Sequence, residues 1–210
     1  MDLTRDYTHI DQYLSELQGD IYQQPLDDGH ASMAKQVIEN WVTKLTTCNN
    51  VLDVGCGQGD MQEWFEELGL EYTGVTLGID YLVATRANRN VSKQDYTFLS
   101  YPDNSFDLIF ARHSLEHSFS PILSLMEWHR VATSWLCLIL PTPSYWGVAG
   151  RNHYSVVNAS QAKFLMGRAG WVPIWEDMSD KREFRFMAQK MNRLGYDDST
   201  VEYDKVKVEE

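Results

Sequence analysis

A short apolar strand followed by alternating glycines is the feature that most constrains the fold of this chain. Residues 51–54 read Val-Leu-Asp-Val, and residues 55–59 read Gly-Cys-Gly-Gln-Gly. An amphipathic run opens at Met61, so the expected order is strand, glycine turn and helix. Such a turn lets a ligand lie against bare backbone, and the helix start offers free N–H groups and a positive dipole end. This arrangement is typical of sites for nucleotide-like ligands.

The unit of strand and helix then repeats along the chain. A second apolar strand at 72–77 and a helix at about 80–90 complete a βαβ unit, which implies parallel strands and a right-handed crossover. We therefore predict an α/β fold: a doubly wound, seven-stranded, Rossmann-like sheet that is mostly parallel and ends in an antiparallel C-terminal hairpin. The later strands are expected at 106–110, 136–140, 171–177 and 183–189.

Length and charge limit the class of protein. The 210 residues, 43% of them hydrophobic, suit one folded domain. No apolar run approaches the roughly 20 residues of a membrane span, and the polar N-terminus is unlike a secretory signal, so we expect a cytoplasmic protein without a membrane partner. The 18 basic against 30 acidic residues give a net charge of −12, which repels nucleic acid. The sequence gives no indication of oligomeric state.

Two motifs carry a resemblance to a known family. The loop spacing Gly-x-Gly-x-Gly, preceded by Asp53, differs from the Gly-x-Gly-x-x-Gly of dinucleotide sites. Residues 95–107 read Asp-Tyr-Thr-Phe-Leu-Ser-Tyr-Pro-Asp-Asn-Ser-Phe-Asp, which resembles the stretch D-x-x-x-L-P-F-x-D-x-S-F-D. Both motifs resemble class I S-adenosylmethionine-dependent methyltransferases of the small-molecule type, similar to methyltransferase domain 11. The resemblance covers roughly residues 31–190 and implies the strand order 3-2-1-4-5-7-6.

The resemblance also implies how the chain is divided. Residues 1–190 are expected to form the single methyltransferase domain, with N-terminal helices in residues 1–45 lying across the cofactor cleft. Residues 191–210 are expected to be an acidic, flexible tail.

S-adenosylmethionine is the cofactor that this resemblance implies. The glycine loop would pack on its methionine part, while Asp95 accepts from the adenine amino group and the Tyr96 backbone contacts the ring. The family's ribose-binding acid is replaced by Thr76, so Gln58, Leu77 or Asp80 would share that contact, although we favour Asp80 as a plain helix N-cap. The candidate cofactor residues are Asp53, Gly55, Cys56, Gly57, Gln58, Gly59, Thr76, Leu77, Asp95, Tyr96, Arg112 and His113.

The acceptor side is expected at the carboxyl ends of the central strands, which face the ligand crevice in open α/β sheets. His113 and His153 are the candidate catalytic residues, because imidazole can act as a general base near neutral pH. In related methyltransferases a histidine in a similar place precedes a helix, as His153 does. The substrate-binding candidates are Tyr22, His30, Tyr145, Trp146 and Tyr154, with surface packing as the alternative.

The motif His113-x-x-Glu116-His117 also matches a zinc peptidase pattern. No convincing third ligand lies on a following helix, so we expect no metal site and assign Glu116 and His117 to capping and bracing a helix.

The predicted function is transfer of a methyl group from S-adenosylmethionine to a nucleophilic O, N or C atom of a small-molecule acceptor. One alternative is a non-catalytic S-adenosylmethionine-binding module or partner subunit. Thr76, in place of the ribose-binding acid, favours this alternative because it would bind the cofactor more weakly. Others are a protein methyltransferase, for which neither a basic groove nor an N-P-P-Y tetrapeptide is recognisable, and a zinc hydrolase.

Overall fold

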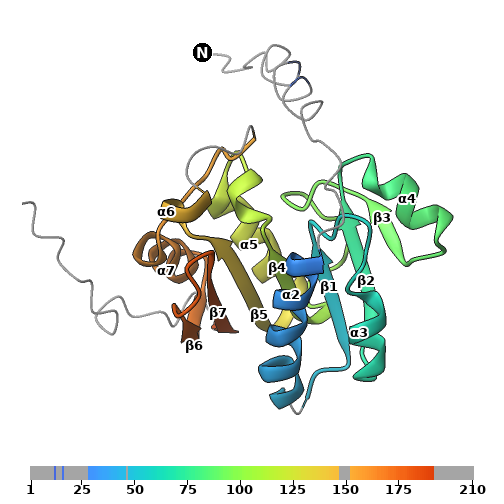
Figure 1. Cartoon of the computed structure of the whole chain (residues 1–210), viewed down its shortest axis with the longest axis horizontal. Coiled ribbons are helices and arrows are strands. Elements are labelled where there is room, and N and C mark those ends of the chain that lie inside the picture. Colours follow the sequence, from blue (N-terminus) through green and yellow to red (C-terminus); the bar gives the residue numbers. More distant parts are fainter. Residues whose placement is uncertain (1–11, 13–15, 17–27, 46, 147–151, 192–210) are drawn as a thin grey trace, which may run out of the picture.

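Seven strands form one sheet in the order β3-β2-β1-β4-β5-β7-β6 (Figure 1). The computed structural model describes residues 12, 16, 28–45, 47–146 and 152–191. The strands are β1 (Asn50–Val54), β2 (Glu71–Thr76), β3 (Val91–Lys93), β4 (Phe106–Arg112), β5 (Ala132–Pro141), β6 (Trp171–Asp177) and β7 (Glu183–Lys190). β1 to β5 pair in parallel, whereas β7 is antiparallel to both β5 and β6. The predicted fold class, strand order and C-terminal hairpin are confirmed.

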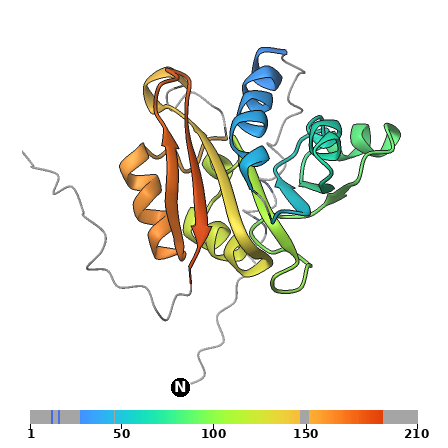
Figure 2. The same cartoon turned by 90° about the horizontal axis from the view of Figure 1, so that it is seen from below.

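Helices cover both faces of this sheet (Figure 2). Alternate residues of the central strands point to opposite faces, as a β-strand requires: Leu52 and Ile109 pack with one buried cluster, Val51 and Leu108 with the other. The helices are α2 (Asp28–Asn40), α3 (Gln62–Glu67), α4 (Asp80–Arg86), α5 (Pro121–Val131), α6 (Pro143–Trp146) and α7 (Ala159–Arg168), with 3₁₀ turns η1 (Val42–Lys44) and η2 (Leu115–His117). Helices α2 and α3 pack on one face, and α5 and α7 on the other.

Three element boundaries differ from the prediction. Helix α2 begins at Asp28, whereas the sequence predicts a loop over residues 25–30 and a helix from about Ala31. Helix α4 ends at Arg86 rather than near residue 90, because Asn88 takes a left-handed conformation with φ 55°. Strand β5 starts at Ala132, directly after α5, and not near residue 136 as predicted.

The parallel strands β1, β2, β4 and β5 all end at one edge of the sheet. β7 begins at this same edge, because Glu183 pairs with Pro141, the last residue of β5. The candidate residues of the glycine loop, the end of β2 and the end of β4 therefore meet there. The predicted helix around residues 7–17 and the predicted tail lie outside the described residues, apart from Gln12 and Glu16, which are helical, and Met191. Within the described ranges, no helix has both the length and the apolar character that a bilayer span needs.

Candidate functional site

The glycine loop turns away from β1 with three residues in the left-handed region. Gly55, Gly57 and Gly59 have φ angles of 72°, 56° and 75°, which side chains other than glycine resist. The backbone N–H groups of Gly55 and Cys56 both donate to the carbonyl oxygen of Val75, at 2.9 and 3.1 Å. The loop is thus fixed across the ends of β1 and β2, and glycine is required there by backbone geometry.

The three glycines differ in what surrounds them. A Cβ added to Gly55 would lie 2.4 Å from the Ser114 hydroxyl oxygen, and one added to Gly59 would lie 2.8 Å from a Val91 methyl group. Both positions are therefore closed by packing inside the protein. Within the described part of the chain, a Cβ on Gly57 would meet only a carboxylate oxygen of Asp80, 4.0 Å away. The middle of the loop therefore borders open space that a ligand's polar chain could fill, which is the geometry a cofactor needs.

Asp53 lies buried beneath this loop and accepts a hydrogen bond of 2.9 Å from the Tyr72 hydroxyl. Burial raises the pKa of Asp53 to about 7, although the Tyr72 hydrogen bond opposes the rise. Tyr72 was not among the predicted site residues. The sequence feature that relates to Tyr72 is Gly74, two residues further along the same face of β2. A Cβ on Gly74 would lie 2.8 Å from the Tyr72 hydroxyl oxygen, so glycine leaves room for the tyrosine side chain.

The pKa of Asp53 predicts a pH-dependent affinity for the cofactor. An ionised Asp53 attracts the ammonium and sulfonium charges of S-adenosylmethionine, whereas a protonated one does not. We expect the affinity, measured by calorimetry between pH 6 and 9, to weaken as the pH falls through about 7. In the wild type, the hydrogen bond from Tyr72 lowers the pKa of Asp53. Tyr72→Phe removes this bond, so the midpoint should move to higher pH. An unchanged pH dependence in Asp53→Asn would contradict this assignment.

The end of β2 places Thr76 and Asp80 beside the glycine loop, and both side chains are buried. The expectation that Asp80 is the N-cap of its helix is wrong: Ile79 occupies that position, and Asp80 is the first residue of α4. Its carboxylate instead accepts a hydrogen bond of 3.3 Å from the Gln58 side chain. An acidic group thus reaches the glycine loop from one helical turn beyond Thr76, and the contact of either residue with ribose stays a prediction.

Asp95 and Tyr96 follow β3 at the other end of the crevice. Asp95 turns one carboxylate oxygen back onto the Thr97 N–H at 2.8 Å, forming an Asx turn. The Tyr96 hydroxyl donates to the Ser114 carbonyl at 2.7 Å, and the Trp128 indole donates to the Tyr96 carbonyl at 3.0 Å. Tyr96 thereby fixes the segment that packs on Gly55. The contacts of Asp95 and Tyr96 with adenine stay predictions.

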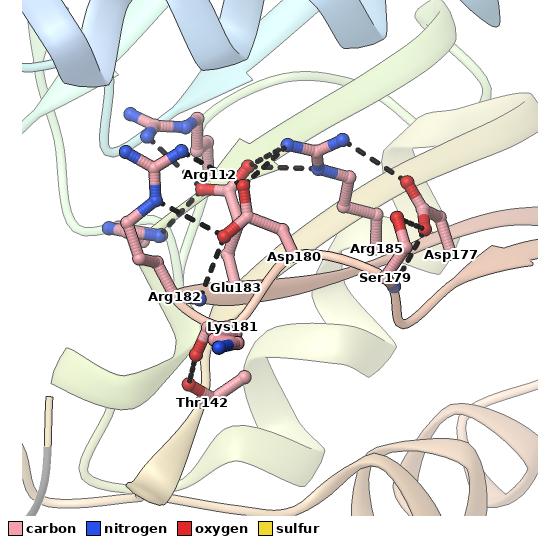
Figure 3. A network of polar contacts seen from close by, with 10 residues as sticks. Arg112, Thr142, Asp177, Ser179, Asp180, Lys181, Arg182, Glu183 and Arg185 are labelled. Carbon is pink, nitrogen blue, oxygen red and sulfur yellow. Dashed lines mark hydrogen bonds and ion pairs between the residues drawn. The ribbon is translucent and has the colours of Figure 1, made fainter. Parts of the chain in front are cut away.

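At the end of β4, Arg112 meets the carboxylate of Glu183, which was not among the predicted site residues (Figure 3). The ring of His113 contacts the same carboxylate. Oε2 of Glu183 lies 3.2 Å from both Arg112 Nη2 and His113 Nε2, and Oε1 lies 2.9 Å from a guanidinium nitrogen of Arg185. Burial would raise the pKa of Glu183, but the hydrogen bond from His113 and the two guanidinium charges outweigh it and hold the pKa at about 2. His113 has a φ of 49°, a strained backbone conformation for this residue type.

The second candidate catalytic residue belongs to a different cluster. His153 packs edge-on against His117, with ring centroids 4.8 Å apart, and Glu116 completes the group. Burial raises the pKa of Glu116 to about 8 and lowers the pKa values of both histidines. The expectation that Glu116 and His117 cap a helix is wrong, because both lie within η2 and its N-cap, Ser114, makes no side-chain cap bond.

The predicted substrate residues are only partly described. Tyr145 is exposed, and Tyr154 packs against Phe119 with ring centroids 4.6 Å apart. His30 lies in α2 and Trp146 ends α6, but their side chains, like all of Tyr22, lie outside the described residues. The substrate assignments stay predictions.

Comparison with known proteins supports the family that the motifs suggest. Residues 52–134 match a family described as a methyltransferase domain. An S-adenosylmethionine-dependent methyltransferase from Archaeoglobus fulgidus is 19% identical, with a TM-score of 0.62 over 76% of this chain and 94% of that one. One from Aquifex aeolicus is 18% identical, with a TM-score of 0.62 over 80% and 100%. The [4+2]-cyclase SpnF is 17% identical, with a TM-score of 0.66 over 88% and 93%. No curated protein matches the sequence.

These structural similarities establish the shared fold, and the family match includes both the glycine loop and the stretch from Asp95 to Asp107. The open space at Gly57 and the nearby Asp80 carboxylate fit S-adenosylmethionine, the cofactor of this family. The sequence match over residues 52–134, the strand order and the loop geometry all agree with the resemblance to class I S-adenosylmethionine-dependent methyltransferases.

Proposed function

We propose that this chain transfers the methyl group of S-adenosylmethionine to a nucleophilic O, N or C atom of a small-molecule acceptor. The observation that carries the proposal is the open cradle at Gly57, at the same sheet edge as the polar cluster that ends β4. The sulfonium supplies the leaving group, so the chain's task is to align nucleophile, methyl carbon and sulfur. Glu183 fixes Arg112 and His113 on the acceptor side of that line.

The charged side chains near the end of β4 limit the class of acceptor. Arg112, Arg185 and His113 all converge on the one buried carboxylate of Glu183, so this part of the edge offers paired charges and no free basic stripe. The net charge of −12 also opposes a phosphate backbone. Both features favour a small acceptor that is positioned by a few directed contacts over a nucleic acid.

Transfer of isotope from labelled cofactor tests the acceptor class. The protein is incubated with S-adenosylmethionine labelled in the methyl group and with a cell extract divided by size into small metabolites, proteins and nucleic acids. We expect label in the metabolite fraction. Label confined to protein or nucleic acid would overturn the small-molecule assignment. Cofactor binding without transfer to any fraction would indicate the alternative, a non-catalytic module.

We further propose His113 as the general base for acceptors that must lose a proton. His113→Asn keeps a residue type that tolerates a left-handed backbone, so the change isolates the imidazole. Turnover with the labelled acceptor should fall roughly 100- to 10,000-fold, the usual contribution of a general base, while the affinity for S-adenosylhomocysteine stays nearly unchanged. Unchanged turnover would remove His113 from the catalytic step.

A further inference from the structure

A second polar cluster lies apart from the Glu183 network. Glu116 and His117 come from η2, and His153 comes from the segment that follows residue 151. One potential ligand atom from each residue lies within 4.8 Å of the other two, and His117 Nε2 is 4.0 Å from Glu116 Oε1. Their convergence is a product of the fold, because 36 residues separate His117 from His153.

The hydrogen bonding of His117 fixes which ring nitrogen faces this cluster. Its Nδ1 lies 3.0 Å from the carbonyl oxygen of Asn152. A carbonyl can only accept, so Nδ1 carries the proton and the neutral ring keeps its lone pair on Nε2, the atom nearest Glu116. A ring N–H bound to a backbone carbonyl is the usual support of a metal-binding histidine.

The other two side chains hold polar atoms that lack partners. Glu116 is 2% exposed, and among the described residues its Oε2 has no hydrogen-bond partner. His153 Nδ1 is likewise buried without one, again counting only the described part of the chain. Each unsatisfied group costs free energy in a buried site. A cation held by both side chains would compensate for this cost.

The two segments that supply these residues are joined by hydrogen bonds to backbone carbonyls. The Ser155 N–H donates to the Glu116 carbonyl at 2.9 Å, and the Ser155 hydroxyl donates to the Ser118 carbonyl at 2.6 Å. Together with the bond from His117 to Asn152, these contacts hold the chain around residue 153 against η2. The donor atoms are therefore presented by a braced backbone, which limits the reorganisation that binding requires.

We propose that Glu116, His117 and His153 bind one divalent transition-metal cation of the zinc class. Two imidazole nitrogens and one carboxylate oxygen are a donor set that zinc takes, and three protein ligands leave a fourth position for water or another oxygen or sulfur donor. Bond lengths of about 2.1 Å place tetrahedral ligand atoms roughly 3.4 Å apart, so side-chain rotation must close a gap of about 1 Å. His113 takes no part, because its ring nitrogen faces Glu183.

Cobalt binding tests this site without any measurement of methyl transfer, so its outcome is independent of the proposed function. Full-length protein is stripped with a chelator and titrated with Co²⁺, whose absorption bands report tetrahedral coordination. We expect one equivalent to bind and Zn²⁺ to displace it. No uptake of Co²⁺ or Zn²⁺ by the folded wild-type chain would overturn the proposal.

Single substitutions locate the ligands. Glu116→Gln and His153→Asn should each weaken Co²⁺ binding at least about 100-fold, because loss of even an outer partner typically costs 10- to 100-fold. His113→Asn is the control and should keep full affinity. Circular dichroism and S-adenosylhomocysteine binding identify variants that remain folded. If Glu116→Gln unfolds the protein, His153→Asn still tests the site, because His153 is less buried than Glu116. Retained Co²⁺ affinity in a folded Glu116 or His153 variant would contradict the proposal.

Discussion

Replacing Gly57 with alanine should reduce the affinity for S-adenosylmethionine roughly 10- to 100-fold while the protein stays folded. The added methyl group meets no atom of the described residues closer than 4.0 Å, so it would occupy the space assigned to the cofactor. Such overpacking costs about 1–3 kcal/mol, and each 1.4 kcal/mol is about tenfold in affinity. Calorimetry with S-adenosylhomocysteine measures the change directly.

Gly69 offers a matched control for the backbone strain. It also has a positive φ, 78°, and a Cβ added there would have nothing within 4 Å, but it lies after α3 rather than in the glycine loop. Gly57→Ala and Gly69→Ala should each lower the free energy of unfolding by about 1–2 kcal/mol, the cost of a left-handed alanine. Only Gly57→Ala should weaken cofactor binding. Equal affinities in both variants would show that the cofactor does not lie against Gly57.

Replacing Glu183 with glutamine should lower the free energy of unfolding by about 3–5 kcal/mol, the usual cost of removing one partner of a buried ion pair. The substitution keeps the size of the side chain but leaves the guanidinium of Arg112 and the ring of His113 without their carboxylate. Urea unfolding measures the loss. The matched control is Glu176→Gln on β6, whose half-exposed ion pair with Lys163 should contribute less than about 1 kcal/mol.

The same network predicts how stability responds to acid. The pKa of Glu183 is lowered from its ordinary value to about 2 in the folded protein. The stabilisation by its ionised form is therefore complete above about pH 4.5 and is lost as the pH falls toward 2. Glu183→Gln should flatten the fall in unfolding free energy across this range relative to the wild type. An equal acid dependence in both proteins would show that Glu183 is not held ionised by its partners.

Local motifs predicted the glycine loop and its turn, whereas its contacts with the cofactor stay predictions. The glycine spacing requires left-handed backbone wherever it occurs, and the structure has all three loop glycines in that region. Strand periodicity and turn residues likewise indicated the sheet and its terminal hairpin, because these signals depend on neighbours in sequence. The early end of α4 escaped prediction, since the left-handed Asn88 interrupts a run that otherwise has helical spacing.

The acceptor half depends on contacts between distant segments, which one sequence does not display. Glu183 reaches Arg112 across 71 residues because β7 pairs antiparallel with β5. From the sequence, Glu183 was predicted only to begin a strand, and its polar partners were not predicted. His153 meets His117 only after the chain returns over η2. Selecting these residues required the strand order and register, and the family motifs fix neither the side-chain partners nor the acceptor.

A crystal structure of the protein with S-adenosylhomocysteine is the most direct test of the central assignment. We expect the amino-acid end of the ligand against the backbone of residues 55–59, the ribose beside Asp80 and the adenine beside Asp95 and Tyr96. A ligand seated elsewhere, or a crevice that stays empty at saturating concentration, would contradict it.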